Sequence, residues 1–126
     1  MFITKFHRSW RGAQDYCMGI GSSLTEISSA DENRFITSNL VRDAGHEDTD
    51  RDYWIGGTDI VHEGKWRWKP SGMLLTWTNW ASNAGQWHNK TEENCLEIVV
   101  RSKQVGYWND DRCDKKLHFV CEKRIS

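Results

Sequence analysis

The chain has 126 residues, a formal net charge of −1, eight tryptophans and a single proline. This length fits one domain, spanning residues 1–126, with a hydrophobic core of its own. Lysine and arginine are scattered among aspartate and glutamate, which argues against binding to nucleic acid or to an anionic membrane. No apolar run is long enough to insert into a membrane, and the first residues lack the apolar segment of a signal peptide.

The four cysteines are Cys17, Cys95, Cys113 and Cys121, and none of them forms a C-x-x-C pair. This spacing argues against a zinc ribbon and against a thioredoxin-like redox site. An even number of cysteines in a small, tryptophan-rich domain favours two disulfides over four free thiols, and therefore a secreted, extracellular protein. Four cysteines allow three pairings, and their spacing alone does not choose among them.

The first half of the chain carries helical patterns. Residues 2–6 alternate weakly between apolar and polar side chains and predict an edge strand. Ser9 has the chemistry of a helix N-cap. Four residues behind it share one helical face: Trp10, Ala13, Cys17 and Ile20.

A second helix is predicted from a capping box, in which Ser29 is the N-cap and Glu32 the third helical residue. Phe35, Ile36 and Leu40 are expected to form its apolar side. The polar run that follows has Asp48, Asp50 and Asp52 at the spacing of an EF-hand loop, with Asp59 at its last ligand position. Tyr53 stands where that loop needs glycine, so we interpret the run as a solvated loop and keep the EF-hand as an alternative.

The second half is rich in strand patterns, predicted at residues 53–57, 65–69, 95–100, 106–110 and 118–121. Alternation places Trp66 and Trp68 on one side of their strand. It places Leu96, Ile98 and Val100 on one face of another. Two helices followed by a β-rich half predict an α+β fold.

Residues 77–95 form a long segment rich in asparagine, glycine and tryptophan that ends on Cys95. It has no strong helical or strand period and holds a cluster of oxygen-bearing side chains. Such a segment is typical of a functional loop carried by a rigid frame.

Taken together, these features resemble the C-type lectin-like domain family, and in particular short single-domain invertebrate lectins such as the perlucin-like proteins of molluscs. The motifs that carry the resemblance are Trp54–Gly57 (WIGG), Asn79–Trp80, Trp108–Asp110 (WND) and Phe119–Glu122 (FVCE). The resemblance implies the disulfides Cys17–Cys121 and Cys95–Cys113. It also implies two helices and a small, mostly antiparallel sheet with a long ligand-binding loop.

In this family, the main calcium site combines a motif in the long loop, a glutamate near the loop-closing cysteine and the Asn-Asp of WND. Sugar hydroxyls bind the ion and the same side chains. The resemblance therefore implies recognition of a monosaccharide or glycan terminus. The residues that match the calcium ligands are Gln86, Glu93, Asn109 and Asp110, and the implied carbohydrate site adds Trp87 and His88.

The loop motif departs from the family pattern. Relatives have Glu-Pro-Asn (mannose type) or Gln-Pro-Asp (galactose type), whereas this chain has Gln86, Trp87 and His88. Gln86 favours galactose or N-acetylgalactosamine. The imidazole of His88 is a poor calcium ligand, and a cis bond before Trp87 in place of proline would cost roughly 2.5–4 kcal/mol. Calcium binding is therefore predicted to be weak or absent.

Three modes of binding are left open. The chain binds sugar through calcium, or binds sugar directly with Trp87 or Trp80 stacked on the pyranose, or binds a protein or mineral surface instead. The sequence contains no nucleophile elbow, phosphate-binding glycine loop or H-E-x-x-H motif, so we expect a binding protein and not an enzyme.

The family's second calcium position is matched weakly by Asp59 and Glu63, which can equally flank a turn at Gly64. Asn89 begins an N-glycosylation sequon in the same long loop. A homo-oligomer is left open as well, since a weak single sugar site usually needs several copies to agglutinate cells.

Overall fold

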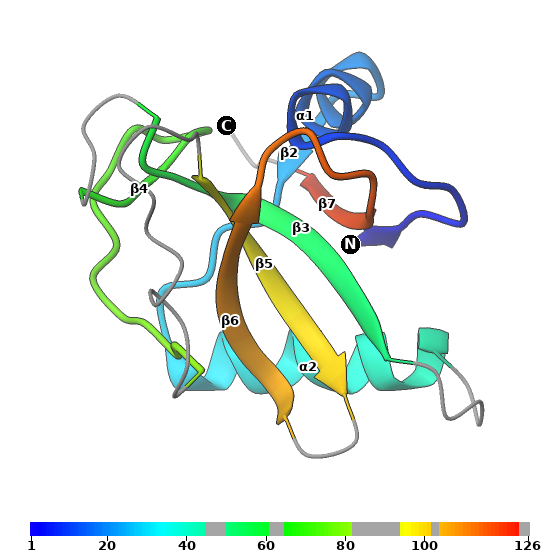
Figure 1. Ribbon diagram of the computed structural model, residues 1–126, viewed down its shortest axis with the longest axis vertical. Coiled ribbons are helices and arrows are strands. Elements are labelled where there is room, and N and C mark those ends of the chain that lie inside the picture. Colours follow the sequence, from blue (N-terminus) through cyan, green and yellow to red (C-terminus); the bar gives the residue numbers. More distant parts are fainter. Residues whose placement is uncertain (45–49, 61–64, 82–93, 102–103, 124–126) are drawn as a thin grey trace.

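The computed structural model describes residues 1–44, 50–60, 65–81, 94–101 and 104–123. In these ranges the chain forms two helices, α1 (Trp10–Gly19) and α2 (Ala30–Ala44) (Figure 1). Neither helix is long and apolar enough to cross a lipid bilayer. The strands are β1 (Phe2–Ile3), β2 (Ser22–Leu24), β3 (Arg51–Thr58), β4 (Arg67–Trp68), β5 (Asn94–Arg101), β6 (Gln104–Arg112) and β7 (His118–Lys123).

The strands form a mixed, mostly antiparallel sheet in the order β1-β7-β3-β5-β6, with β2 also paired to β7 and β4 to β3. The one parallel pairing among these strands is β3–β7, where Tyr53 lies beside His118. In Figure 1, α2 runs across β5 and β6, while α1 lies beyond β2 and β7. The predicted α+β architecture is therefore confirmed.

Helix α1 begins as predicted, because the Oγ of Ser9 accepts a hydrogen bond from the N–H of Gly12 at 3.2 Å. Trp10 and Ala13 are buried against the sheet. Ile20 was predicted to share their face, and this is wrong. It is the C-cap, lies beyond the last helical turn and is 51% exposed.

Both disulfides implied by the family resemblance are present. Cys17–Cys121 links α1 to β7 across 104 residues of sequence, and Cys95–Cys113 links the beginning of β5 to the turn after β6. No free cysteine remains in the chain. The first bond closes the N-terminal part of the fold, and the second closes the end of the long loop.

Helix α2 is capped by Ser29, whose Oγ accepts from the N–H of Glu32 at 3.1 Å. The Glu32 carboxylate accepts hydrogen bonds from the N–H and the hydroxyl of Ser28. In a capping box it would accept from the N–H of the N-cap residue itself, which is one residue later. Ile36 and Leu40 are buried as predicted. The cap therefore forms at the predicted residue with a shifted second half.

Phe35 was predicted to lie on the apolar side of α2, but its side chain is 64% exposed. The buried positions of the helix are Asn33, Ile36, Leu40 and Ala44, which follow the three- and four-residue spacing of one face. Phe35 lies next to that stripe and points outward. The polar Asn33 takes the core position instead.

The EF-hand alternative is wrong. Asp52 belongs to β3 and accepts two hydrogen bonds from the guanidinium of Arg101 at 3.0 Å. Asp59 follows the opposite end of the same strand. At about 3.3 Å per residue the two are about 23 Å apart, so they cannot close around one ion.

Most of the tryptophans predicted to be structural are buried. Trp10, Trp54, Trp68 and Trp108 are at most 3% exposed, and Trp66 is partly buried against the same core. Four large rings fill much of a core this small.

The indole of Trp108 connects the sheet to α2. Its Nε1 donates to the Oδ1 of Asn33 at 2.9 Å, and the Nδ2 of Asn33 donates to the carbonyl of Gly106 at 3.1 Å. Gly106 has a φ of +82°, and a Cβ there would lie 2.5 Å from the Oγ1 of Thr37. Only glycine therefore lets β6 approach the helix this closely.

We predict that Asn33→Ala lowers the unfolding free energy by about 1–3 kcal/mol, since it leaves the buried indole N–H without its acceptor and removes one of the two side-chain donors to the Gly106 carbonyl. Asn39→Ala is the matched control on the same helix, because the bond recorded for the Asn39 side chain among the described residues is an exposed one to the carbonyl of Phe35. Urea denaturation followed by circular dichroism measures both. A loss of less than about 0.5 kcal/mol for Asn33→Ala would contradict a structural role of this bridge.

Candidate functional site

The long loop begins beside β6. The carbonyl of Asn79 accepts from the N–H of Trp108 at 2.8 Å, and the carbonyl of Trp108 accepts from the N–H of Ala81 at 2.8 Å. The Asn79 side chain also donates to the Gly106 carbonyl at 2.8 Å. The described start of the loop is thus attached to the WND strand.

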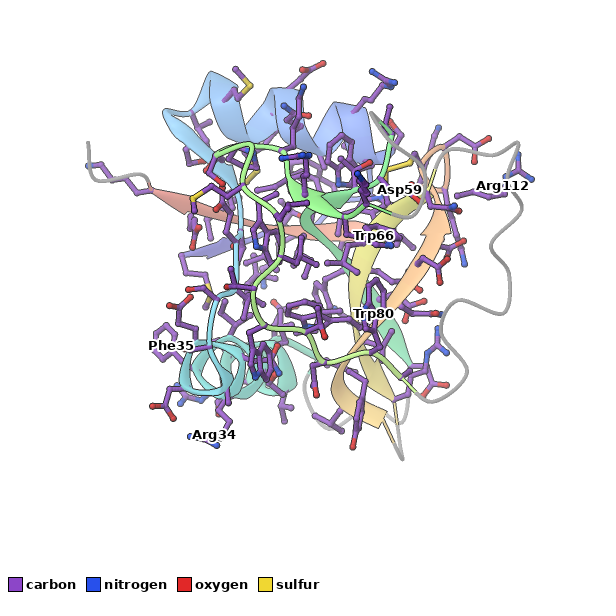
Figure 2. The ribbon with its side chains drawn as sticks, turned by 90° about the vertical axis from the view of Figure 1, so that its left-hand side faces the viewer. Arg34, Phe35, Asp59, Trp66, Trp80 and Arg112 are labelled. Atoms are coloured by element: carbon purple, nitrogen blue, oxygen red, sulfur yellow. A yellow bond between two sulfur atoms is a disulfide. The ribbon has the colours of Figure 1, made fainter. Side chains whose placement is uncertain are left out.

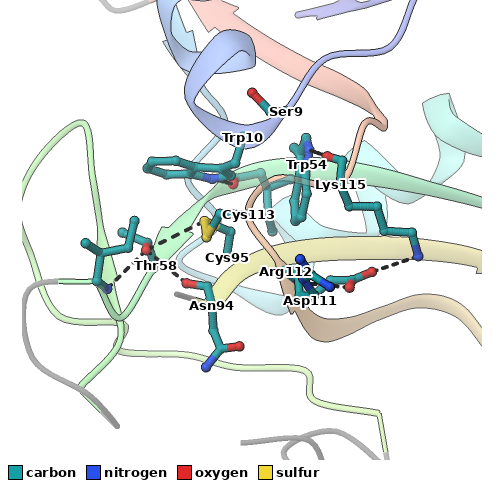
Figure 3. Close-up of a disulfide and its surroundings, with 12 residues drawn as sticks. Ser9, Trp10, Trp54, Thr58, Asn94, Cys95, Asp111, Arg112, Cys113 and Lys115 are labelled. Carbon is teal, nitrogen blue, oxygen red and sulfur yellow. Dashed lines mark hydrogen bonds and ion pairs between the residues drawn. A yellow bond between two sulfur atoms is a disulfide. The ribbon is translucent and has the colours of Figure 1, made fainter. Parts of the chain in front are cut away.

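The loop ends at the beginning of β5, where Asn94 pairs with Arg112 of β6. The carbonyl of Asn94 accepts from the Oγ1 of Thr58 at 3.0 Å and from the N–H of Asp59 at 3.4 Å. Figure 3 shows the bond from Thr58 next to the Cys95–Cys113 disulfide. The second end of the loop is therefore attached to both β3 and β6.

These two attachments lie on either side of Asn109 and Asp110. One end of the loop is bonded to Trp108, and the other pairs with Arg112. The fold thus places Ala81 and Asn94, the described residues that flank 82–93, on either side of Asn109 and Asp110. The predicted site residues Gln86, Trp87, His88 and Glu93, together with the sequon residue Asn89, lie outside the described residues, so their roles stay predictions.

Asn109 has a buried side-chain amide oxygen that lacks a hydrogen bond among the described residues. Its Oδ1 is inaccessible to solvent and has no hydrogen-bond partner among the described residues. Buried amide oxygens nearly always have a partner. Asp110 beside it is 5% exposed. A ligand hydroxyl, an ion or a residue of the loop can supply the bond that the Asn109 oxygen lacks.

The described residues meet only part of what calcium requires. Asn109 and Asp110 supply amide and carboxylate oxygens, the donor types that calcium prefers, but the ion needs six to eight. Within the described ranges no three His, Cys, Asp or Glu side chains are grouped to hold a metal ion. A calcium site at this position therefore depends on Gln86 and Glu93.

Asp59, half of the predicted second calcium site, is 4% exposed at the end of β3. Its backbone N–H holds the carbonyl of Asn94, which gives Asp59 a structural contact at the end of the loop. Its predicted partner Glu63 is outside the described residues. The second calcium site stays a prediction.

Trp80 is the described aromatic residue that adjoins the site. It is half-buried, forms an isolated bridge with Trp108 and packs edge-on against Trp66 with ring centroids 5.2 Å apart. Figure 2 shows Trp66 and Trp80 as neighbours on one side of the molecule. Trp77 also packs edge-on against Trp108, at 5.5 Å. This cluster fixes the orientation of Trp80 next to the loop.

Glu97 is a buried acidic residue for which the sequence pattern assigned no role. It lies in β5 opposite Asn109 of β6 and Trp54 of β3, and it is 1% exposed. Neither of its carboxyl oxygens has a hydrogen-bond partner among the described residues. Its neighbours on the same face, Cys95 and Val99, are buried as well. Their apolar character is the sequence signal that this face does not meet solvent.

The turn after Cys113 helps to explain this burial. The Trp54 indole donates to the carbonyl of Lys115 at 3.1 Å, so the turn lies across this face of the sheet (Figure 3). Burial raises the pKa of Glu97 to about 9, and the negative charges of Asp52 and Asp111 add to the rise. Glu97 is therefore protonated in the folded protein at neutral pH.

This protonation makes stability depend on pH. The folded state holds a proton on Glu97 that the unfolded state loses above about pH 4.5, so the unfolding free energy should fall as pH rises from about 4.5 to about 9. We predict that Glu97→Gln flattens this decline and is about 1–3 kcal/mol more stable than the parent at pH 8. The control is Asp114→Asn, an exposed carboxylate. Parallel pH profiles for the Glu97 variant and the parent would contradict the assignment.

Comparison with known proteins agrees with this geometry. A sequence model of the Lectin C-type domain matches residues 7–123. The C-type lectin mosGCTL-7 of Aedes aegypti is 30% identical over 129 residues, which cover 99% of this chain and 83% of that protein. The CD209 antigen of Papio hamadryas is 30% identical over 122 residues, which cover 97% of this chain but only 31% of CD209.

Solved structures show the same fold. The mouse scavenger receptor C-type lectin carbohydrate-recognition domain superposes with a TM-score of 0.77 and 28% identity, covering 99% of this chain and 88% of that one. Human lithostathine gives a TM-score of 0.83 at 23% identity over 98% of this chain and 82% of that one, a likeness of fold alone. With nearly its whole length matched, the chain belongs to the C-type lectin domain family.

Proposed function

We propose that this chain is a carbohydrate-binding lectin that recognises a monosaccharide or glycan terminus. Asn109 and Asp110 of β6 contact the sugar together with residues of the 82–93 loop. The observation that carries the proposal is the buried Asn109 oxygen, which has no partner among the described residues and lies between the two attachments of the loop. Membership of a lectin family, and a structural relative named as a carbohydrate-recognition domain, support it.

The two side chains offer complementary hydrogen bonds. The Asn109 amide presents an acceptor oxygen and two N–H donors, whereas the Asp110 carboxylate only accepts. Sugar hydroxyls donate and accept, so one hydroxyl can bridge both residues. Trp80 or Trp87 supplies a flat apolar surface for the C–H face of the ring. A few fixed polar groups beside an aromatic ring are the usual composition of such a site.

The loop residues determine which sugar is preferred. Gln86 matches the galactose-type motif, so we propose galactose or N-acetylgalactosamine as the ligand class. His88 and Glu93 lie in the same loop and add hydrogen bonds to the hydroxyls. Elution from a galactose column by free galactose but not by mannose supports this preference, and equal elution by both sugars contradicts it.

Calcium is not essential in this proposal. Gln86, Glu93, Asn109 and Asp110 would be its ligands, and its chemistry would be to draw two sugar hydroxyls into its coordination sphere. Because His88 and Trp87 replace an oxygen ligand and a proline, direct hydrogen bonds are proposed to suffice. Asp59 and Glu63 would form at most a weak second site.

We propose that the chain binds carbohydrate outside the cell. Two disulfides in a small domain favour an oxidising compartment. A glycan on Asn89 would stand in the binding loop itself. We propose a binding protein and not an enzyme, and assembly into a homo-oligomer would raise the avidity of a weak site.

We predict that Asn109→Ala abolishes retention on immobilised galactose, and that Glu93→Ala does so too, because each removes a polar contact to the sugar. The loss should be tenfold or more, which corresponds to about 1.4 kcal/mol. Asn39→Ala on α2 is the matched control and should be retained like the parent. If both variants bind as the parent does, the sugar site is elsewhere. If the parent binds no glycan on an array, a protein or mineral partner replaces this proposal.

Chelation of calcium provides a separate test. We predict that binding persists in EDTA, since Trp87 and His88 replace the proline and an oxygen ligand of the family's loop motif. The measurement is retention on the same column with calcium and with EDTA. Complete loss in EDTA, restored by added calcium, would show that the ion is required despite Trp87 and His88.

A further inference from the structure

A cavity of about 400 Å³ lies where the beginning of α2 meets Met1 and β7. Its apolar lining comes from Met1, Phe35 and Ile36. Its remaining lining residues are four carboxylates, Glu26, Asp31, Glu32 and Glu122. In Figure 2, Phe35 lies on the opposite side of the view from Arg112 of β6. We name this feature the α2 groove, and it shares no residue with the candidate sugar site.

Phe35 gives the α2 groove an exposed aromatic face. Its side chain is 64% exposed, whereas Ile36 beside it is 5% exposed and belongs to the core. Met1, at 48% exposure, adds a second accessible apolar side chain. Single exposed apolar residues are common on protein surfaces. Here two of them adjoin the same hollow, where a ligand can cover both.

The carboxylates give the groove a negative rim. Among the described residues, Arg34 pairs with Asp31 of this rim. Because the Arg34 and Asp31 side chains are 73% and 86% exposed, their pair adds little stability and can exchange partners. No lysine or arginine among the described residues lines the groove beside these four carboxylates, so the rim attracts positive charge.

Glu122 is a carboxylate of the groove that an incoming cation would stabilise. One of its oxygens accepts from the N–H of Glu26 at 3.0 Å. Burial raises the pKa of Glu122, and the charges of Glu26 and Glu32 raise it further. A positive group placed in the groove would offset both effects and favour the ionised form.

The lining selects a long cationic side chain over a bare ion. No three acidic or histidine side chains in the described part of the chain are grouped to hold a metal ion, and much of the groove presents carbon atoms. Arginine suits both the apolar and the acidic side chains of this lining. Its methylene stem packs on apolar surface, and its planar guanidinium stacks on an aromatic ring and pairs with two carboxylate oxygens at once.

We propose that the α2 groove docks an arginine-bearing basic segment of a protein partner. An arginine head lies over the Phe35 ring and pairs with Glu122 and Glu32, while an apolar neighbour covers Met1. The lectin can then hold a protein on one side while its loop binds sugar on another. The proposal stands independently of sugar recognition.

The test is a titration of ¹⁵N-labelled protein with the capped hexapeptide Leu-Arg-Gly-Arg-Leu-Arg. The counter-peptide carries glutamate in place of each arginine. We expect amide shifts that map to residues 26, 31–36 and 122, weaken at high salt and do not occur with the glutamate peptide. Shifts that map elsewhere, equal binding of both peptides, or a response to calcium alone with none to the peptide would overturn the proposal.

Variants complete the test. Phe35→Ser and Glu122→Gln should each weaken the peptide about threefold to tenfold. The Phe35 side chain is largely exposed, and glutamine keeps the acceptor for Glu26, so both variants should stay folded by circular dichroism. Val41→Ser, at an exposed site on the same helix, is the matched control and should bind as the parent does.

Glycan retention should be unchanged in all three variants, which separates a failure of the α2 groove from a failure of the sugar site. Parent-like peptide binding by Phe35→Ser would contradict the proposal.

Discussion

The carbonyl of Gly106 and the indole of Trp108 form the junction on which the rest of the fold depends. The carbonyl accepts from the side-chain amides of Asn33 and Asn79, and the indole donates back to Asn33. One bond comes from α2 and another from the start of the long loop, so helix, sheet and loop meet at one strand. The absence of a side chain at Gly106 permits this approach, because a Cβ would collide with Thr37. The next residues along the strand are the proposed ligands Asn109 and Asp110.

A rigid frame explains how a segment without a strand or helix pattern can carry specific recognition. Backbone bonds to Trp108 fix one end of the loop, while the β5–β6 pairing and the Cys95–Cys113 disulfide fix the other. The loop sequence can then vary without loss of the core, since the core is made by buried tryptophans outside it. The proposed binding chemistry of Trp87 and His88 can therefore differ from that of relatives without a change of fold.

Local chemistry was sufficient to predict much of the fold. The N-caps at Ser9 and Ser29 form with the expected bonds, and alternation in β5 placed Leu96 and Ile98 correctly in the core. The cysteine pairing needed the family resemblance, because spacing left three choices. The loop motif named site residues, but it could not show that Asn109 keeps a buried oxygen without a described partner, since that depends on contacts between distant segments.

The misplacement of Phe35 and the lack of any prediction for Glu97 share one cause, which is that periodicity describes one element at a time. Phe35 satisfies an apolar pattern, yet the buried stripe of α2 passes through Asn33, because the Trp108 indole needs a hydrogen-bond partner there. Glu97 looked unremarkable in an alternating strand. It is buried between neighbouring strands, on the face that the Lys115 turn crosses. Both positions are decided by long-range packing, which a single sequence does not display.

The central claim is that a glycan binds at the Asn109–Asp110 end of β6. The most direct measurement is a nuclear magnetic resonance titration of ¹⁵N-labelled protein with galactose, N-acetylgalactosamine, mannose and N-acetylglucosamine. The account predicts that at least one galactose-type sugar shifts the amides of residues 108–112 and the indole N–H of Trp80 most strongly. Largest shifts at another surface, or no shift with any of the four sugars, would contradict it.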